Sequence, residues 1–288
     1  MRHRMPAAGG SAHPHRVPRG ELGIRWTIGA VNGRGFEALR LSIWGAFHLF
    51  GGRARYAVCV NTVPVAEARA RTGGLPVPVR WVQADDLVPD WLRACFDEAM
   101  GEGTGWKFAP VRMFEDVREL ALDNDCILWA EPDALSGWLE HPESFLLAED
   151  VRRCVGAFDA LCSSSPRNSG IRGVPASFDL EGAFRRVLAA FPVRFTSELD
   201  EQGLQIATLE RTGRLHVVST EDVSICSPFW PHQPSLGRCG AHFVGMNARA
   251  LPFRYYGRPA SEWVAENWER HLPALRARVG LPGQPATT

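Results

Sequence analysis

IRWTIGAVN, residues 24–32, is an apolar run that closes on Asn and is followed by a Gly-Arg-Gly turn. An apolar run bounded by turn residues predicts a β-strand. FEALRLSIWGAFHLF (36–50) comes next, and its apolar residues recur near helical spacing, which predicts a helix packed on a sheet. RYAVCVN (55–61) has the strand pattern again and also ends in Asn. These segments therefore predict strand, helix and strand in succession.

The same alternation continues along the chain. VAEARARTGG (65–74) predicts a short helix, VPVRWV (77–82) a third strand, and PDWLRACFDEAM (89–100) a helix that begins with Pro. The second half adds two predicted helices, 178–191 and 261–279, and short strands over 214–219 and 222–227. Alternating strands and helices are typical of an α/β fold with a mostly parallel central sheet flanked by helices.

Composition narrows the function classes. The 288 residues are enough for a sizeable core, and 45% hydrophobic with 22% charged residues is ordinary for a soluble globular protein. Lys+Arg and Asp+Glu both number 32, which argues against nucleic acid or an anionic membrane as the main partner. The seven cysteines are scattered, and no apolar window suits a secretory or transmembrane segment. We therefore expect a reducing, cytoplasmic setting, with residues 1–20 and 281–288 as disordered tails.

Polar side chains stand where three predicted strands end: Asn32, Asn61 and Asp123. Ligands bind at the carboxyl ends of strands in open sheets of this kind, so we expect one shared crevice. ALDNDCILWA (121–130) places Asp123 and Asp125 at positions i and i+2, where strand side chains point the same way. Two such carboxylates suit one hard cation, Mn²⁺ or Mg²⁺, with phosphate oxygens as further ligands. The alternative is a polar strand end with Asx turns.

Four further segments carry candidate site residues: GTGWKFAPVRMF (103–114), SSSPRNSGIRGVP (163–175), SELDEQGLQIATL (197–209) and CGAHFVGMN (239–247). Lys107 and Arg112 lie just upstream of the aspartates, where cations would meet an anionic phosphate. Plainer interpretations remain open for each segment. Lys107 and Arg112 are then surface cations, Asn168 is a turn residue, His242 is a hydrogen-bonded core residue, and the acids of 198–201 lie in a solvated loop.

Taken in this order, the motifs resemble those of the GT-A-fold nucleotide-sugar glycosyltransferases. The likeness is greatest to the retaining type that includes glycogenin and the lipopolysaccharide galactosyl- and glucosyltransferases. In that family an Asp-x-Asp motif is followed by an Asn-(Ala/Ser)-Gly segment near the donor sugar, an Asp-Gln-Asp segment at the reaction centre, and a late metal-binding His. The counterparts here are Asp123-Asn124-Asp125, Asn168-Ser169-Gly170, Glu201-Gln202-Gly203 and His242, so the resemblance spans residues 24–250.

The resemblance implies a single GT-A-like domain over residues 21–280, with a nucleotide-binding half up to residue 130. It implies transfer of a sugar from a nucleotide diphosphate, a UDP-sugar above all, to a saccharide or other hydroxyl acceptor. The implied metal ligands for Mn²⁺ or Mg²⁺ are Asp123, Asp125 and His242. The implied donor-binding residues are Ala30, Val31, Asn32, Asn61, Lys107, Arg112, Asn124, Asn168, Ser169 and Gly170. The implied catalytic residues are Asp200, Glu201 and Gln202.

This sequence departs from the family pattern at two places. The third position of the Asp-Gln-Asp segment is Gly203, and His242 is followed by Phe-Val-Gly-Met-Asn instead of a glycine and basic residues. Retention and inversion of the sugar configuration therefore both stay open. If the reaction inverts, Glu198, Asp200 or Glu201 would act as the base on the acceptor hydroxyl.

Other functions are weighed against transfer. A GT-A-like binding or scaffold protein without activity is one alternative, and a nucleotidyltransferase is another, although GRGF (33–36) has only one arginine where that class has a basic glycine-rich signature. Zinc binding by Cys226, His232, Cys239 and His242 does not fit paired Cys-x-x-Cys spacing. A haloacid-dehalogenase phosphatase would carry its Asp-x-Asp near the chain start.

Overall fold

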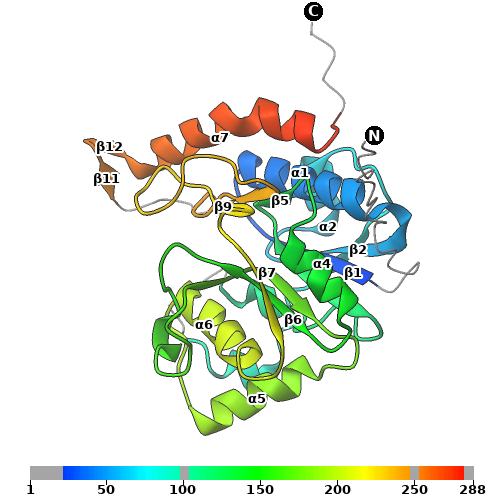
Figure 1. The fold of residues 1–288 in the computed structure, drawn as a ribbon, viewed down its shortest axis with the longest axis vertical. Helices are drawn as coiled ribbons and strands as arrows, with labels where there is room; N and C mark the ends of the chain where they lie inside the picture. Colours follow the sequence, from blue (N-terminus) through cyan, green and yellow to red (C-terminus); the bar gives the residue numbers. More distant parts are fainter. Residues whose placement is uncertain (1–21, 98–103, 247–252, 282–288) are drawn as a thin grey trace, which may run out of the picture.

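A seven-stranded sheet forms the centre of the computed structural model, which describes residues 22–97, 104–246 and 253–281 (Figure 1). Its strands are β1 (Leu22–Ile28), β2 (Ala54–Val60), β3 (Arg80–Gln83), β4 (Arg118–Asp123), β6 (Phe145–Glu149), β7 (Arg167–Val174) and β8 (Leu215–Val218). Their order is β3-β2-β1-β4-β7-β6-β8. Only β7 runs antiparallel to its neighbours; the pairs β1–β2, β1–β4, β2–β3 and β6–β8 are parallel. The mostly parallel central sheet predicted from the sequence is confirmed.

Two small sheets and the helices complete the described part. The small sheets are β5 (Cys126–Leu128), β10 (Gly240–His242) and β9 (Val223–Ile225), in that order, and the hairpin β11 (Arg254–Tyr255) with β12 (Arg258–Pro259). The α-helices are α1 (Gly33–Phe50), α2 (Val65–Thr72), α3 (Asp90–Arg93), α4 (Asp133–Glu140), α5 (Leu180–Ala190), α6 (Glu198–Leu209) and α7 (Ala260–Arg278). Short 3-10 turns are η1 (Gly51–Arg53), η2 (Thr104–Phe108) and η3 (Gly156–Phe158).

Helices cover both faces of the large sheet because strand side chains alternate between them. On one face, Trp26 of β1 packs with Phe36 of α1 and Trp138 of α4 in a buried apolar cluster. On the other face, Leu147 of β6 packs with Phe184 of α5 and other apolar residues of α5 and α6. In Figure 1, α5 and α6 accordingly lie together below the sheet, away from α1. The first helix begins where Asn32, its N-cap, accepts a hydrogen bond from the Gly35 N–H.

The C-terminal helix α7 lies alongside α1 at the top of Figure 1 and covers the small β5-β10-β9 sheet. Trp268 of α7 packs edge-on against Phe243, with ring centroids 5.1 Å apart. The antiparallel pairing of β10 with β5 places His242 opposite Cys126. A late segment of the chain is thereby brought beside the end of β4.

The helix predicted over 89–100 is wrong beyond its first turn. Within the described residues α3 covers only Asp90–Arg93, and residues 98–100 lie outside them. Phe96 and Asp97 leave the helical path, because the Asp97 N–H donates to the Phe195 carbonyl (2.9 Å). The Phe96 ring packs on the Phe195 ring, with centroids 5.5 Å apart. Burial of an aromatic side chain therefore overrides the helical periodicity.

Two segments considered as polar loops or turns are regular and largely buried, although Glu198 and Leu199 at the start of the first are exposed. Residues 198–209 form helix α6, in which Glu201 is only 4% exposed, and Asn168, Ser169 and Gly170 lie inside β7. Both segments find hydrogen-bond partners in the interior, which permits their burial. The predicted tails, apart from Leu281, lie outside the described residues.

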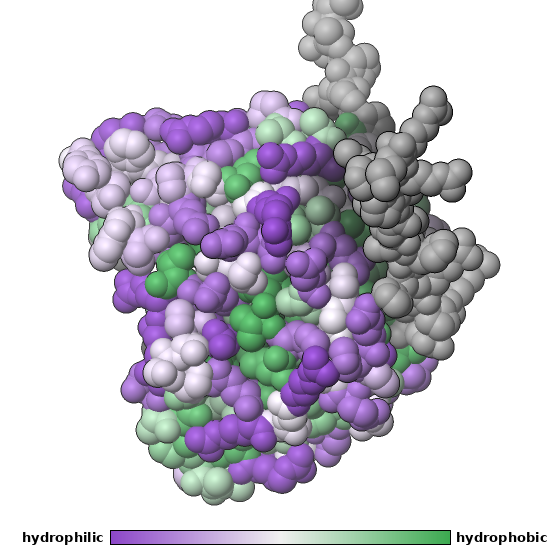
Figure 2. Space-filling view, viewed as in Figure 1, coloured by the Kyte–Doolittle hydropathy of each residue, from purple (hydrophilic) through white to green (hydrophobic). Residues whose placement is uncertain are grey.

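The surface is mixed in character. On the face shown in Figure 2, hydrophilic side chains predominate, with hydrophobic ones in a band near the middle. Among the described residues, no helix combines the length and apolarity that crossing a membrane requires.

Candidate active site

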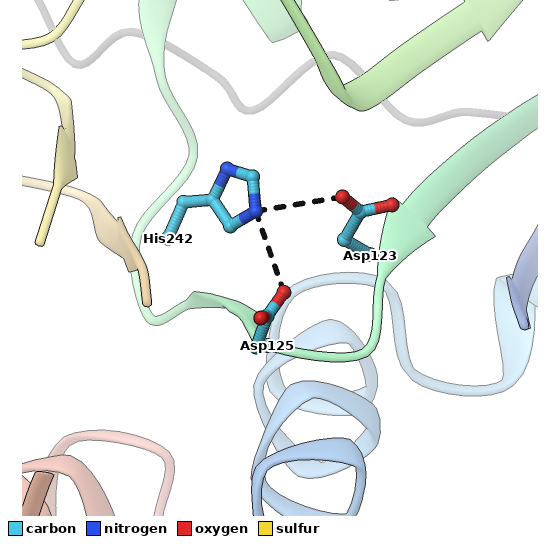
Figure 3. A group of neighbouring side chains, drawn as sticks. All are labelled: Asp123, Asp125 and His242. Atoms are coloured by element: carbon cyan, nitrogen blue, oxygen red, sulfur yellow. Dashed lines mark ion pairs between the residues drawn. The ribbon is translucent and has the colours of Figure 1, made fainter. Parts of the chain in front are cut away.

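Asp123, Asp125 and His242 come together at one edge of the sheet (Figure 3). Asp123 is the last residue of β4, Asp125 lies in the turn before β5, and His242 ends β10. Nε2 of His242 lies 3.4 Å from Oδ2 of Asp123 and 3.3 Å from Oδ1 of Asp125. One ligand atom from each residue lies within 4.8 Å of those of the other two. Two carboxylates and one imidazole are donors that can hold a divalent cation.

Close packing holds His242 in this position. The Phe243 N–H donates to the Asp125 carbonyl (3.0 Å), which ties the histidine strand to the aspartate turn. A Cβ atom on Gly170 would lie 2.3 Å from the His242 ring. Only glycine therefore lets β7 pass this close to the imidazole.

Burial and charge act against each other in this cluster. Burial alone would lower the pKa of His242, but hydrogen bonds with Asp123 and Asp125 raise it to about 10. Burial would raise the pKa of Asp123, but the Lys107 ammonium and His242 hold it well below its usual range. In the absence of a metal ion, His242 therefore carries a proton at neutral pH, which a bound divalent cation would displace.

The His242 proton predicts how the metal-free protein responds to pH. Because the folded-state pKa of about 10 exceeds the ordinary 6.5, its stabilisation is complete below pH 6.5 and is lost as pH rises to about 10. We expect the free energy of unfolding, measured by urea titration in EDTA, to fall across this window. His242→Gln should flatten that dependence, and an equal slope in both proteins would contradict it.

Lys107, in η2, is the only lysine in the sequence, and it lies beside the cluster. Its Nζ donates to Asp123 Oδ2 (3.0 Å) and to Ser169 Oγ (3.3 Å), and lies 3.7 Å from Glu201 Oε2. Burial would lower the pKa of Lys107, but Asp123 and Glu201 keep it above its usual range. The side chains of Lys107 and Asp123 remain 27% and 20% exposed, against 7% for Asp125. Lys107 and Asp123 therefore form the exposed side of the cluster.

Helix α6 presents Glu201 and Gln202 to the same region. Gln202 Oε1 accepts from the Ser169 N–H (3.2 Å), and its Nε2 donates to the Cys154 carbonyl (2.7 Å). Burial raises the pKa of Glu201 to about 7, with a further upward contribution from Asp123 and an opposing one from Lys107. A carboxyl group whose pKa lies near neutral pH is suited to taking up or giving a proton.

Asn168 lies next to the site and is held at both ends of its amide. Its Nδ2 donates to Asp150 Oδ2 (2.8 Å), and its Oδ1 accepts from the Gly170 N–H (2.7 Å). Because Asn168 is 5% exposed, these bonds stabilise the strand beside His242.

The residues of the first half that are predicted to bind the sugar donor follow β1 (Ala30 and Val31) and β2 (Asn61). The Ala30 N–H donates to Thr62 Oγ1 (3.0 Å), and the carbonyl of Val31 accepts from Arg71 Nη2 (2.8 Å). Asn61 is 2% exposed, and its Nδ2 has no hydrogen-bond partner among the described residues. An unpaired buried donor is costly, so the Asn61 amide would gain from a ligand that accepts its N–H.

Asn32 and Asn124 tie the start of α1 to two other segments. Asn32 Nδ2 donates to the Met246 carbonyl (3.2 Å) in addition to its capping role, and Asn124 Nδ2 donates to the Gly35 carbonyl (3.1 Å). These bonds connect the start of α1 to the segment after β10 and to the aspartate turn.

Two predicted site residues have other roles here. Arg112 donates through its two terminal nitrogens to the carbonyls of Ala176, Phe178 and Val117, so its donors are used by the main chain. Asp200 belongs to the capping box of α6 and accepts from the main-chain N–H groups of Ala157, Thr196 and Ser197. The polar atoms of both residues therefore serve the main chain and not the aspartate cluster.

Sequence reasoning missed four polar residues that lie behind the site: Arg25, Glu119, Arg172 and Gln205. A signal was available, because Arg25 and Arg172 are charged residues inside the apolar runs IRWTI and GIRGV. Such residues are costly in a strand interior unless they are paired. Which partners they find depends on contacts between strands, and these are invisible in the sequence.

Comparison with solved structures identifies the fold. The galactosyltransferase LgtC, in complex with donor and acceptor sugar analogues, matches with a TM-score of 0.54 and 13% identity over 92% of this chain and 98% of its own. An active-site mutant of LgtC (0.49, 12% identity, 86% and 95% covered) and the bifunctional glycosyltransferase WbbM (0.49, 15%, 92% and 53%) are also similar. No family model and no curated protein sequence matches. The chain therefore has the GT-A fold that its sequence motifs led us to expect.

Proposed function

We propose that this protein is a metal-dependent glycosyltransferase that uses a nucleotide-diphosphate sugar, with UDP as the first nucleotide to test. The observation that carries the proposal is the convergence of Asp123, Asp125 and His242 at the strand ends of a GT-A fold. Ligands of open α/β sheets bind at this edge.

The three residues would hold Mn²⁺ together with the diphosphate of the donor. The bound cation supplies positive charge where negative charge develops on the departing diphosphate. Lys107 would add a second positive charge on the exposed side of Asp123, within 3.0 Å of its carboxylate. Ser169 and Gln202 would orient the donor sugar, since the Ser169 hydroxyl accepts from Lys107 and the Ser169 N–H donates to Gln202.

Glu201 is the carboxyl that we propose for proton transfer or for stabilising positive charge at the sugar. It is nearly buried and lies 3.7 Å from Lys107. Its pKa of about 7 lets it take up or release a proton at neutral pH.

A binding protein without transfer activity is the second candidate, and one observation favours it. A Cβ on Gly203 would lie 2.1 Å from the Val155 carbonyl, so the third carboxylate of the Asp-Gln-Asp pattern has no room here. Such a protein would bind the nucleotide sugar and release it unchanged.

The test of the proposed function is UDP binding with and without Mn²⁺. At about 100 times its Kd, UDP should add about 2.7 kcal/mol to the free energy of unfolding and raise Tm by several degrees. EDTA should abolish the shift, and Asp123→Asn should abolish it in Mn²⁺. A UDP-sugar hydrolysis assay, in which the release of UDP is measured, then separates the two candidates. Absence of any shift with UDP and other nucleoside diphosphates in Mn²⁺ would contradict both.

A further inference from the structure

A row of buried polar side chains runs from the site into the protein interior, through α6, β7, β4 and β1. Each member is at most 4% exposed: Glu201, Gln205, Arg172, Glu119 and Arg25. We call these five residues the buried polar chain. It connects the Glu201 carboxyl, which we propose to work in the site, across β7 and β4 to β1.

The first link of the buried polar chain lies on α6. Gln205 Nε2 donates to Glu201 Oε1, which is one helical turn away and therefore on the same helix face. Gln205 Oε1 accepts from Arg172 Nη1 at 2.6 Å. The amide can satisfy both neighbours only in one orientation, because its nitrogen donates and its oxygen accepts. The Arg172 guanidinium thus dictates that Gln205 offers an N–H to Glu201.

The other end of the buried polar chain holds the segment that carries Lys107. Arg172 Nη2 lies 3.5 Å from Glu119 Oε1, and Glu119 Oε2 accepts from the Met113 N–H (2.5 Å). Arg25 lies 3.9 Å from Glu119 and donates through Nη2 to the carbonyl of Lys107 itself (2.6 Å). The same chain of contacts therefore reaches both Glu201 and the main chain of Lys107.

Stability alone is a weak reason for such a chain. Replacing buried ion pairs by apolar residues of similar volume is often neutral or stabilising, because desolvation offsets the attraction. Little empty space remains between Glu201 and the segment that carries Lys107. A cavity of only ≈ 10 Å³, lined in part by Lys107, Asp123, Arg172 and Gln205, has room for about one water molecule. Direct contacts between side chains, and not solvent, therefore set the distance between the Glu201 carboxyl and the Lys107 ammonium.

We propose that Gln205 is a positioning residue, which with Arg172, Glu119 and Arg25 fixes the Glu201 carboxyl relative to the Lys107 ammonium. This inference rests on the proposed function, since it concerns the transfer step in that site. In this proposal Gln205 acts only through its hydrogen bond to the Glu201 carboxyl. Its loss should therefore lower kcat and leave the KM for the donor nearly unchanged.

The test compares Gln205→Met with Thr208→Val, a matched change on the same helix. Thr208 is also buried (2% exposed), but its hydroxyl donates only to the Leu204 carbonyl (2.7 Å). In UDP-sugar hydrolysis with Mn²⁺, Gln205→Met should lower kcat at least about tenfold with less than a twofold change in KM. Thr208→Val should stay within about twofold of wild type.

A double-mutant comparison separates positioning from a general loss of structure. If Gln205 acts through Glu201, Gln205→Met should have no further effect in a Glu201→Gln background. If Gln205→Met does not fold, Gln205→Asn serves instead, since it is too short to reach both Glu201 and Arg172 and should show the same loss.

The outcomes distinguish the two levels of inference. An active wild type in which Gln205 variants keep wild-type kcat, or lose as much kcat without the Glu201 carboxylate as with it, overturns the positioning role alone. A wild type that hydrolyses no nucleotide sugar overturns the proposed function, and the positioning role falls with it.

Discussion

Asp125→Asn is expected to lower sugar transfer or donor hydrolysis by about 1000-fold, which corresponds to about 4 kcal/mol of transition-state stabilisation. The change keeps the shape of the side chain and removes one of the two carboxylates that converge on His242 Nε2, 3.3 Å away. Mn²⁺-dependent binding of UDP should weaken by about 100-fold or more. Steady-state rates and calorimetric titration of UDP in Mn²⁺ measure the two effects separately.

The matched control for Asp125→Asn is Asp222→Asn. Asp222 is buried to a similar extent (6% exposed) but pairs with Arg238 at 2.6 Å, outside the candidate site. It should lose stability and keep the rate of the folded enzyme. If Asp125→Asn retains wild-type Mn²⁺-dependent binding, or if both variants lose activity equally, the metal site is assigned wrongly.

Lys107→Met is expected to lower kcat by about 100- to 1000-fold, the usual cost of removing one group that stabilises developing charge. Lys107 is the only lysine of the chain and the ammonium closest to Asp123, at 3.0 Å. Its three N–H donors face Asp123, Ser169 and Glu201. Methionine keeps the length of the side chain but provides neither charge nor donors, so the loss should appear in kcat under saturating donor.

Two controls sharpen the Lys107 experiment. Lys107→Arg keeps the charge but replaces a compact ammonium by a planar guanidinium, so it should recover only part of the rate. Arg55→Met removes a surface cation that pairs with Asp116 (2.7 Å) and should stay within about twofold of wild type. Wild-type kcat in Lys107→Met would exclude an electrostatic role for the ammonium.

The sequence predicted the candidate metal cluster through the ends of apolar strands. Asp123 ends an apolar strand and Asp125 lies in the turn that follows it, so both carboxylates stand at the same strand end. His242 was included because of the order of motifs, and the pairing of β10 with β5 brings it to the aspartates. Local pattern therefore selected residues that a long-range strand pairing then assembles.

The roles of single polar residues were harder to predict. Asp200 and Glu201 are adjacent acids in the sequence, yet Asp200 caps its helix while Glu201 faces Lys107. Arg112 and Lys107 lie five residues apart, yet Arg112 donates to main-chain carbonyls instead of the aspartates. Neighbouring residues differ in this way because the direction of a side chain depends on the helix or turn around it.

The sequence by itself determined the alternation of strands and helices, the mostly parallel sheet and the polar strand ends, because side-chain periodicity and turn residues are local properties. Only the tertiary structure decided that Phe96 leaves its helix to pack on Phe195, and that Arg25 and Glu201 belong to one buried polar chain. Burying a charge is costly unless a partner compensates it, and here that partner lies on another strand or helix. Contacts between distant segments therefore decide which of the many polar residues face the site.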